Sequence, residues 1–307
     1  MKKVMRKPHL LKPGDTIEIV SPSSPFERSR FLSSVDDLES RGYHLKYHKS
    51  VFDKKEYLAG SDVLRRKSLV KALGRTSTQA LFFTRGGFGM MRLFHPQDIK
   101  IKNLPVKIIM GMSDHTPLLN KLAWTHKMVT IHGPVIAGSL FEGLSGKQKE
   151  SLFAQLSTEK EKVVEKDLQV IRSGNAKGIL WGGNLTMLQS SLATPLDIPW
   201  DRGVLFLEEV NENPYRIDRM FCQLALAGKL SRLSGLLLGD FSDASGAIIS
   251  SSFLKSMVQR YLPKGIPVVS NIKVGHEHMD HLLPIGGQVE IRKQGKMLVI
   301  SSLVEKK

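Results

Sequence analysis

Cysteine is almost missing from this sequence, since Cys222 is the only one among 307 residues. An intramolecular disulfide is therefore excluded, and the composition is compatible with a reducing compartment. No apolar run approaches the ~20 residues that a membrane-spanning helix needs. The N-terminal stretch 1–15 is basic but lacks the apolar core of a secretory signal. We therefore expect a cytoplasmic protein with no membrane span.

Acidic residues are outnumbered, because 45 Lys and Arg stand against 29 Asp and Glu, which gives a net charge of +16. Such an excess favours anionic partners, whether nucleic acid, a membrane surface or an acidic small molecule. The basic residues are dispersed, however, and form no long tract, no aromatic-interleaved strand and no zinc-finger spacing. We therefore expect no nucleic-acid partner.

Strand and helix patterns alternate through the first half of the chain. Apolar or alternating runs predict strands at 14–20, 43–48, 80–84, 106–110 and 129–131, with helical patterns between them. This alternation predicts a flavodoxin- or Rossmann-like parallel sheet with helices on both faces, which we assign to residues 1–137. Ligands of such sheets bind beyond the carboxyl ends of the strands.

The second half has a different pattern. Residues 138–170 are polar with one short amphipathic helix, so we interpret them as a linker. Residues 171–307 have shorter strands in a mixed order and end in a hairpin pattern. An apolar strand at 203–207 continues directly into Glu208 and Glu209, two carboxylates that are costly to bury without partners.

A strand-to-helix turn is predicted around Ser113, between the apolar run 106–110 and the helical pattern that carries Leu118 and Leu122. This is the position in which α/β hydrolases present a nucleophile. His115 stands where the second glycine of G-x-S-x-G would be. Alternatively, Ser113 is a helix N-cap and Asp114 interacts with the helix dipole.

A glycine-rich segment, 85–89 (RGGFG), follows the predicted strand 80–84. It is neither a dinucleotide fingerprint nor a P-loop. Its glycines would let backbone N–H groups approach an oxyanion or a carboxylate, or it is an ordinary loop.

Three histidines cluster near the C-terminus: His276, His278 and His281. They lack the H-E-x-x-H register, and no cysteine accompanies them, so we predict no metal site. His276 follows Gly275 at the end of a predicted strand, where it is either solvated or a general base.

Taken in order, these segments resemble the LD-carboxypeptidase family of serine peptidases. The family includes murein tetrapeptide carboxypeptidases and the self-immunity peptidases that inactivate microcin C. The resemblance spans residues 14–286, nearly the whole chain. The motifs that carry it are 57–62 (YLAGSD), 85–89 (RGGFG), 111–114 (GMSD), 132–134 (HGP), 182–185 (GGNL), 207–208 (LE), 214–219 (PYRIDR) and 275–276 (GH).

The resemblance implies a Ser–His–Glu triad, with Ser113 as nucleophile, His276 as base and Glu208 as orienting acid. It also implies an N-terminal α/β domain, a C-terminal α/β domain with β-barrel character, and an active site between them. The family is typically dimeric and needs no metal, so we expect a homodimer with no cofactor. Glu209 could exchange roles with Glu208, because side chains alternate along a strand and only one of the two can face the site.

The chemistry agrees with these assignments. A serine hydroxyl needs an adjacent base, which His276 would supply, and Glu208 would hold the imidazole in the productive tautomer. The N–H groups of Gly87 and Asp114 would stabilise the oxyanion. An exopeptidase must also recognise the chain end. Arg85 and the neighbouring Gly86 are the candidates for binding the substrate carboxylate, although Arg85 could instead pair with a buried acid and brace the loop.

The sequence departs from the family pattern at a few places. Phe88 stands where Tyr is more usual, and Glu209 where Asp is more usual. Residues 277–281 are unusually polar, and the helix after Ser61 is richer in Arg and Lys than expected. These departures concern substrate choice and surface charge more than the triad.

We therefore expect a cytoplasmic LD-carboxypeptidase of peptidoglycan recycling, which removes the terminal D-alanine from a murein tetrapeptide through an acyl-enzyme. The alternative within the enzyme class is a microcin C-type immunity peptidase that cuts an acyl-adenylate analogue. It would need an aromatic pair to stack the adenine, and the sequence does not place one. An alternative of another class is a basic nucleic-acid-binding protein on a peptidase scaffold, which requires a lost triad residue or a focused basic face.

Overall fold

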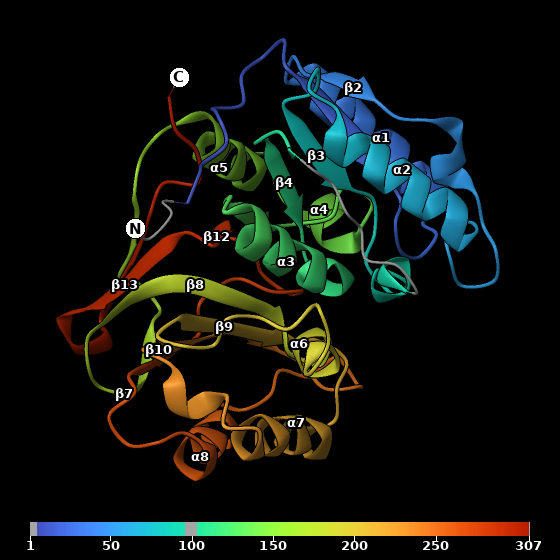
Figure 1. Ribbon diagram of the computed structural model, residues 1–307. Coiled ribbons are helices and arrows are strands. Elements are labelled where there is room, and N and C mark those ends of the chain that lie inside the picture. The colour runs from blue at the N-terminus through green and yellow to red at the C-terminus, as the bar shows by residue number, and fades with distance from the viewer. Residues whose placement is uncertain (1–4, 96–102, 307) are drawn as a thin grey trace.

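Residues 5–95 and 103–306 are described by the computed structural model, which confirms an α/β protein with two sheets (Figure 1). The first sheet is mostly parallel, and the second is a curled mixed sheet that forms a half-barrel. Residues 1–4 of the basic N-terminal stretch lie outside the described part. None of the described helices is long and apolar enough to cross a membrane.

The first sheet has the strand order β12-β5-β4-β3-β1-β2. Its strands are β1 (Thr16–Val20), β2 (His44–Lys46), β3 (Ala80–Phe83), β4 (Ile108–Gly111), β5 (Thr130–His132) and β12 (Leu283–Ile285). The strands β1 to β5 run parallel, and β12 pairs antiparallel with β5. Because β4, β3 and β1 are neighbours, the loops after their carboxyl ends meet at one edge of the sheet.

The helices of this half connect and cover the parallel strands. They are α1 (Arg28–Ser40), α2 (Asp62–Gly74), α3 (Thr116–His126), α4 (Ser139–Gly143) and α5 (Gly146–Ser157), with short 3-10 helices η1 (Lys49–Phe52), η2 (Met91–Phe94) and η3 (Ser113–His115). Ser61 begins α2 as its N-cap, because its hydroxyl accepts a hydrogen bond from the Leu64 N–H at 3.3 Å.

The second sheet has the order β6-β14-β13-β8-β9-β10-β11-β7. Its strands are β6 (Lys162–Val164), β7 (Gln169–Arg172), β8 (Ala176–Asn184), β9 (Val204–Glu209), β10 (Gly235–Phe241), β11 (Val268–Ser270), β13 (Gln288–Arg292) and β14 (Met297–Ile300). The strands β8 to β11 are parallel, whereas β13, β14, β6 and β7 join antiparallel. The helices of this half are α6 (Leu185–Ser191), α7 (Pro214–Leu226) and α8 (Ser251–Tyr261), with 3-10 helices η4 (Leu230–Arg232) and η5 (Lys293–Gly295).

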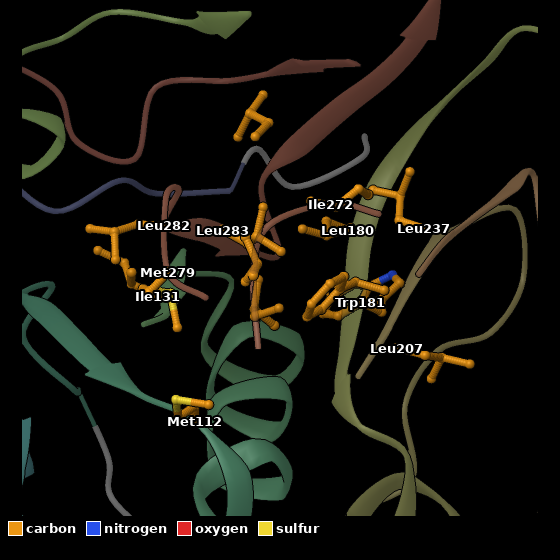
Figure 2. Packing of buried hydrophobic residues seen from close by; sticks show 14 of the residues in the cluster. Met112, Ile131, Leu180, Trp181, Leu207, Leu237, Ile272, Met279, Leu282 and Leu283 are labelled. Carbon is orange, nitrogen blue, oxygen red and sulfur yellow. The ribbon is translucent and has the colours of Figure 1, made fainter. Parts of the chain in front are cut away.

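The two halves pack on one another through α3 and β8. Figure 1 shows α3 between the first sheet and β8, whereas α7 and α8 lie on the far side of β9 and β10. One apolar cluster contains buried residues from both sheets. Figure 2 shows Met112 and Ile131 from the first half on one side and Leu180 and Trp181 from the second half on the other. This shared core fixes the carboxyl ends of the two sets of strands relative to each other.

The predicted strand 106–110 begins later than expected, because β4 starts at Ile108. Lys107, the polar residue of that run, is buried, and its ammonium donates to the Ala72 carbonyl and to Thr78 Oγ1, both at 3.0 Å. Burial lowers the pKa of Lys107 to about 8. The Lys107 side chain thus hydrogen-bonds to the end of α2, and β4 begins one residue later.

The segment 138–170 contains more regular structure than a linker would need. Leu152, Phe153 and Leu156 of α5 are buried, and the Phe153 ring lies 5.6 Å from the Tyr43 ring of the first half. The strand β6 joins the edge of the second sheet. In addition, β12 belongs to the sequence of the second half but to the sheet of the first. The division into 1–137, 138–170 and 171–307 stays a prediction.

Candidate active site

Ser113 lies in a strained turn directly after β4. Its φ is +59°, a left-handed conformation that costs energy for a residue with a side chain. The turn needs glycine at 111, because a Cβ there would lie 2.6 Å from the Phe83 ring. The N-cap positions of η3 and α3 are Met112 and His115, so Ser113 caps neither helix. The structure therefore does not show the N-cap role that was the alternative for this serine.

His115 supports this turn from below. Its ring is buried and stacks on Phe83 with centroids 4.3 Å apart. Its Nδ1 lies 2.9 Å from the Met112 carbonyl oxygen, an acceptor, so Nδ1 carries the proton and donates. Burial lowers the pKa of His115 to about 4, which keeps the ring neutral. The residue in place of the second glycine is thus a structural brace.

The glycine-rich loop passes directly over Ser113. A Cβ at Gly86 would lie 3.0 Å from Ser113 Cβ and 3.1 Å from Ser113 Oγ. The loop is tied to the turn by Asp114, whose buried Oδ2 accepts the Met90 N–H at 2.8 Å. Burial raises the pKa of Asp114. Glycine at 86 therefore keeps the space above the serine hydroxyl free.

A second loop, 21–25, holds the glycine-rich loop from the other side. Ser24 donates its N–H to the Gly86 carbonyl, and its hydroxyl accepts the Phe88 N–H, both at 3.1 Å. Gly87 has a φ of +89°, and a Cβ there would lie 2.8 Å from Ser24 Cβ. The backbone around Gly87 is thus fixed beside Ser113, although the oxyanion role of the Gly87 and Asp114 amides stays a prediction.

Arg85 is exposed and donates from Nη1 to the Pro25 carbonyl at 2.8 Å. This contact joins the same two loops, but through a backbone carbonyl and not through the buried acid that the sequence alternative assumed. The role of Arg85 and Gly86 in binding a substrate carboxylate stays a prediction.

The second half contributes a buried acid and a histidine. Glu208 in β9 is fully buried, and its Oε2 lies 2.6 Å from Nδ1 of His276. Glu209 faces the other side of the strand, where it accepts the Asn184 side-chain amide at 2.9 Å and the Thr186 N–H at 2.8 Å at the start of α6. Of the two adjacent acids, Glu208 is therefore the one that contacts the histidine.

This contact shifts both pKa values. Burial opposes charge on Glu208, but the neighbouring His276 outweighs burial and lowers the pKa of the carboxyl. Burial likewise opposes charge on His276, but the Glu208 carboxylate raises the pKa of the imidazole above 6.5. Because Nδ1 is engaged by Glu208, Nε2 is the nitrogen that remains for proton transfer.

Asp240, at the end of β10, holds the loop that carries His276. Its Oδ2 accepts the N–H groups of Glu277 at 3.0 Å and His278 at 2.7 Å, and its Oδ1 lies 2.9 Å from the His278 ring. Gly275 packs so closely that a Cβ there would lie 2.6 Å from Asp240 Cβ.

Within residues 5–95 and 103–306, no group of three His, Cys, Asp or Glu side chains could hold a metal ion.

The residues around Ser113 and those around Glu208 and His276 are brought together through β5 and β8. His132 of β5 is paired in register with Gly111 at the end of β4, and its ring lies 5.1 Å from the Phe206 ring of β9. On the other side, the Asn184 N–H at the end of β8 donates to Thr116 Oγ1 at 3.1 Å. The turn of Ser113 and the end of β9 thus lie at the same junction. The Ser113 hydroxyl itself makes no hydrogen bond to a described residue.

Asp240 and Ser24 are residues of this region that sequence reasoning missed, and His132 entered it only within the motif 132–134, with no role assigned. His132 is buried, and burial lowers its pKa to about 4. Neither of its ring nitrogens has a hydrogen-bond partner among the described residues, and neither does Glu208 Oε1. The signal for Asp240 was available, because it ends an apolar strand as Glu208 does. The role of Ser24 depends on contacts between loops and left no signal in the spacing.

Comparison with known proteins decides the family. The family model of the LD-carboxypeptidase N-terminal domain matches residues 17–133, and that of the C-terminal domain matches residues 177–291. The chain belongs to the LD-carboxypeptidase family. This confirms the resemblance that the sequence motifs indicated, and the two matched regions are the two halves that meet at Ser113 and Glu208.

Relatives within and near the LD-carboxypeptidase family extend over almost the whole chain. A probable murein peptide carboxypeptidase of Bacillus subtilis is 31% identical over 301 residues, which cover 96% of this chain and 94% of the relative. The crystal structure of muramoyltetrapeptide carboxypeptidase from Oxalobacter formigenes is 29% identical, with a TM-score of 0.78 and coverage of 94% and 100%. Microcin C7 self immunity protein MccF in complex with aspartyl sulfamoyl adenosine is 22% identical and shares the fold, with a TM-score of 0.85 and coverage of 97% and 99%.

Proposed function

We propose that this protein is a serine LD-carboxypeptidase that removes the terminal D-alanine from murein tetrapeptide. The observation that carries the proposal is the 2.6 Å contact between His276 Nδ1 and buried Glu208, at the junction that also holds the strained turn of Ser113. The murein peptide carboxypeptidases among the relatives support the substrate class.

The proposed reaction begins when Ser113 Oγ attacks the carbonyl of the L-configured residue and His276 Nε2 takes its proton. The C–N bond then breaks, His276 gives the proton to the amine of D-alanine, and an ester with Ser113 remains. Water, deprotonated by His276, hydrolyses this acyl-enzyme. The N–H groups of Gly87 and Asp114 stabilise each oxyanion, and Glu208 stabilises the imidazolium.

In this proposal the exposed Arg85 binds the free carboxylate of D-alanine, while one of its N–H groups stays on Pro25. The kinetics of the Arg85→Lys variant distinguish a residue that binds the substrate carboxylate from one that only braces the glycine-rich loop. Loss of a carboxylate contact impairs turnover of the free-acid tetrapeptide much more than that of its C-terminal amide. Equal losses on both substrates would instead show a brace, and the N–H groups of 86–89 would be the next candidates.

The test of the substrate is incubation with murein tetrapeptide and with its LL-configured analogue, followed by mass spectrometry. We expect the terminal alanine to be released from the tetrapeptide and not from the LL analogue, and the Ser113→Ala variant to release it from neither. Cleavage of both peptides at equal rates would contradict the L–D specificity.

The proposal also includes a cytoplasmic homodimer, and sedimentation of the purified protein tests the oligomeric state.

One observation favours a second candidate, cleavage of an amide next to an acyl-adenylate analogue. Tyr57 and Phe88 form an exposed aromatic pair, with ring centroids 5.7 Å apart, and Phe88 belongs to the loop over Ser113. Exposed aromatic rings can stack a nucleobase. Microcin C is therefore included in the same mass-spectrometric experiment. Its cleavage at a rate above that of the tetrapeptide would favour this second function.

A further inference from the structure

A basic cavity lies apart from Ser113, between β1, the end of β2 and α2. Its volume is about 420 Å³. Five cationic side chains line it: Lys46, Arg65, Lys67, Lys71 and Arg75. Among the described residues that line it, Glu18 is the one acid. The cavity therefore concentrates part of the positive charge that the sequence disperses, including the excess of Arg and Lys in the helix after Ser61.

Two of the five cations already have acidic partners. Arg75 Nε lies 2.9 Å from Glu18 Oε2, and the buried Arg65 pairs with Asp62, which does not line the cavity. Lys46, Lys67 and Lys71 are different, because none of their side chains has a hydrogen bond or an ion pair with a described residue. The cavity thus retains three uncompensated positive charges.

The arrangement of the lysines is mildly unfavourable without an anion. Lys67 and Lys71 are four residues apart on α2, so they lie on the same face of the helix, where like charges repel. Lys46 comes from β2, the strand beside β1, and faces the same cavity. The Ser68 hydroxyl also lines the cavity and makes no hydrogen bond to a described residue. A bound anion would relieve the repulsion and use this hydroxyl as a donor.

The rest of the wall suits an organic group. Val20, Val51 and Leu64 line the cavity, and so does Tyr47, whose side chain is 39% exposed. Binding sites for small molecules commonly have volumes of roughly 300–1,000 Å³ with apolar walls and few polar groups. Lysine is a common phosphate ligand that acts as a point charge.

We propose that this cavity binds a phosphorylated small molecule of about nucleotide size, with its phosphates on Lys46, Lys67 and Lys71 and its organic part against Tyr47 and the apolar wall. The site is distinct from the peptidase site, because Ser113, Glu208 and His276 do not line it. It does not depend on the proposed hydrolysis.

The test is calorimetric titration of the intact protein with pyrophosphate, ADP and uncharged adenosine at physiological salt. The variant is Lys67→Ser/Lys71→Ser, and both side chains are exposed, so the fold should be retained. The matched control is Lys255→Ser/Lys264→Ser, which removes the same charge at exposed positions outside the cavity. Lys67→Arg/Lys71→Arg keeps the charge in place.

We expect ADP to bind the wild type more tightly than pyrophosphate does, and adenosine not to bind. The Ser double variant should weaken ADP binding at least ~10-fold, whereas the control and the Arg variant should keep it. An equal loss in the cavity variant and in the control would show diffuse surface charge and overturn the proposal. Absence of binding of both phosphates to the wild type would also overturn it, whatever the peptidase activity.

Discussion

The two halves of the candidate active site are built in different ways. Around Ser113 most of the important features belong to the backbone: a left-handed φ, glycine at 111 beneath the turn and glycine at 86 above it, although one buried carboxylate, Asp114, also ties the loop to the turn. Around His276 they are buried carboxylates, since Glu208 contacts the ring and Asp240 holds its loop. The Ser113 half depends mainly on backbone geometry, and the His276 half depends on charge. Substitutions in the two halves should therefore change activity and its pH dependence in different ways.

The largest expected effect is that of Ser113→Ala. Removal of the proposed nucleophile should lower kcat by about 10⁶-fold, while the melting temperature stays close to that of the wild type. Single-turnover kinetics and thermal unfolding measure the two quantities. Retention of a substantial rate would mean that another group attacks the peptide.

Glu208→Gln tests the charged half. The amide cannot stabilise the imidazolium, so kcat should fall by about 10⁴-fold. In the proposed mechanism His276 must lose its proton to act, so its raised pKa places the acid limb of kcat/KM above pH 6.5. Without the carboxylate that pKa falls, so the limb should move to lower pH.

Glu209→Gln is the matched control, one residue further along β9. Glu209 contacts the start of α6 and makes no hydrogen bond to His276, and its charge raises the His276 pKa less than Glu208 does. This substitution should therefore reduce stability slightly and move the acid limb much less than Glu208→Gln does. If both variants move the limb equally, the assignment of Glu208 as the orienting acid is wrong.

Gly86→Ala tests the half that depends on shape. The new methyl group would lie about 3 Å from Ser113 Cβ and Oγ, so it would displace the loop or the serine. We expect kcat/KM to fall by about 10²-fold with an unchanged pH profile, because geometry changes and charge does not. Gly143→Ala in α4 is the control, since a Cβ there meets nothing within 4 Å, and it should leave activity unchanged. A shifted acid limb in Gly86→Ala would contradict the separation of the two halves.

The smallest expected effect concerns stability in acid. His115 and His132 have a pKa of about 4 in the folded protein, against 6.5 for the ordinary imidazole. The unfolded chain therefore binds more protons between these values, and the free energy of unfolding falls as pH drops from 6.5 to 4. Each ring accounts for up to about 3 kcal/mol of this fall.

Denaturant unfolding at a series of pH values tests this dependence, which arises from two rings of the first half. His115→Gln and His132→Gln should each make the decline between pH 6.5 and 4 shallower, whatever their effect at neutral pH. A decline as steep as that of the wild type in both variants would show that other groups cause the acid sensitivity.

Some of the site could be predicted because the signals are local. A strand followed by 111–114 (GMSD) and a helix predicts a turn at Ser113, and an apolar strand that ends in Glu208 and Glu209 places a carboxylate at a sheet edge. The caps at Ser61 and Asn184 were predictable for the same reason, because an N-cap contacts an N–H only two or three residues away.

Other features depend on segments far apart in the chain. Local spacing left open whether Glu208 or Glu209 meets His276, since the answer requires the position of a loop 68 residues away. The pairing of β12 with β5, the burial of α5 and the brace from Asp240 to the loop of His276 are of the same kind.

The sequence by itself determined the alternation of strands and helices, the turn of Ser113 and the family, because periodicity, turn residues and motifs are properties of neighbouring positions. The tertiary structure alone decided which acid contacts His276, how the segment 138–170 is used, and that Lys46, Lys67 and Lys71 surround one cavity. The physical reason is that burial, ion pairing and charge repulsion act between side chains that packing brings together, whatever their separation in the chain.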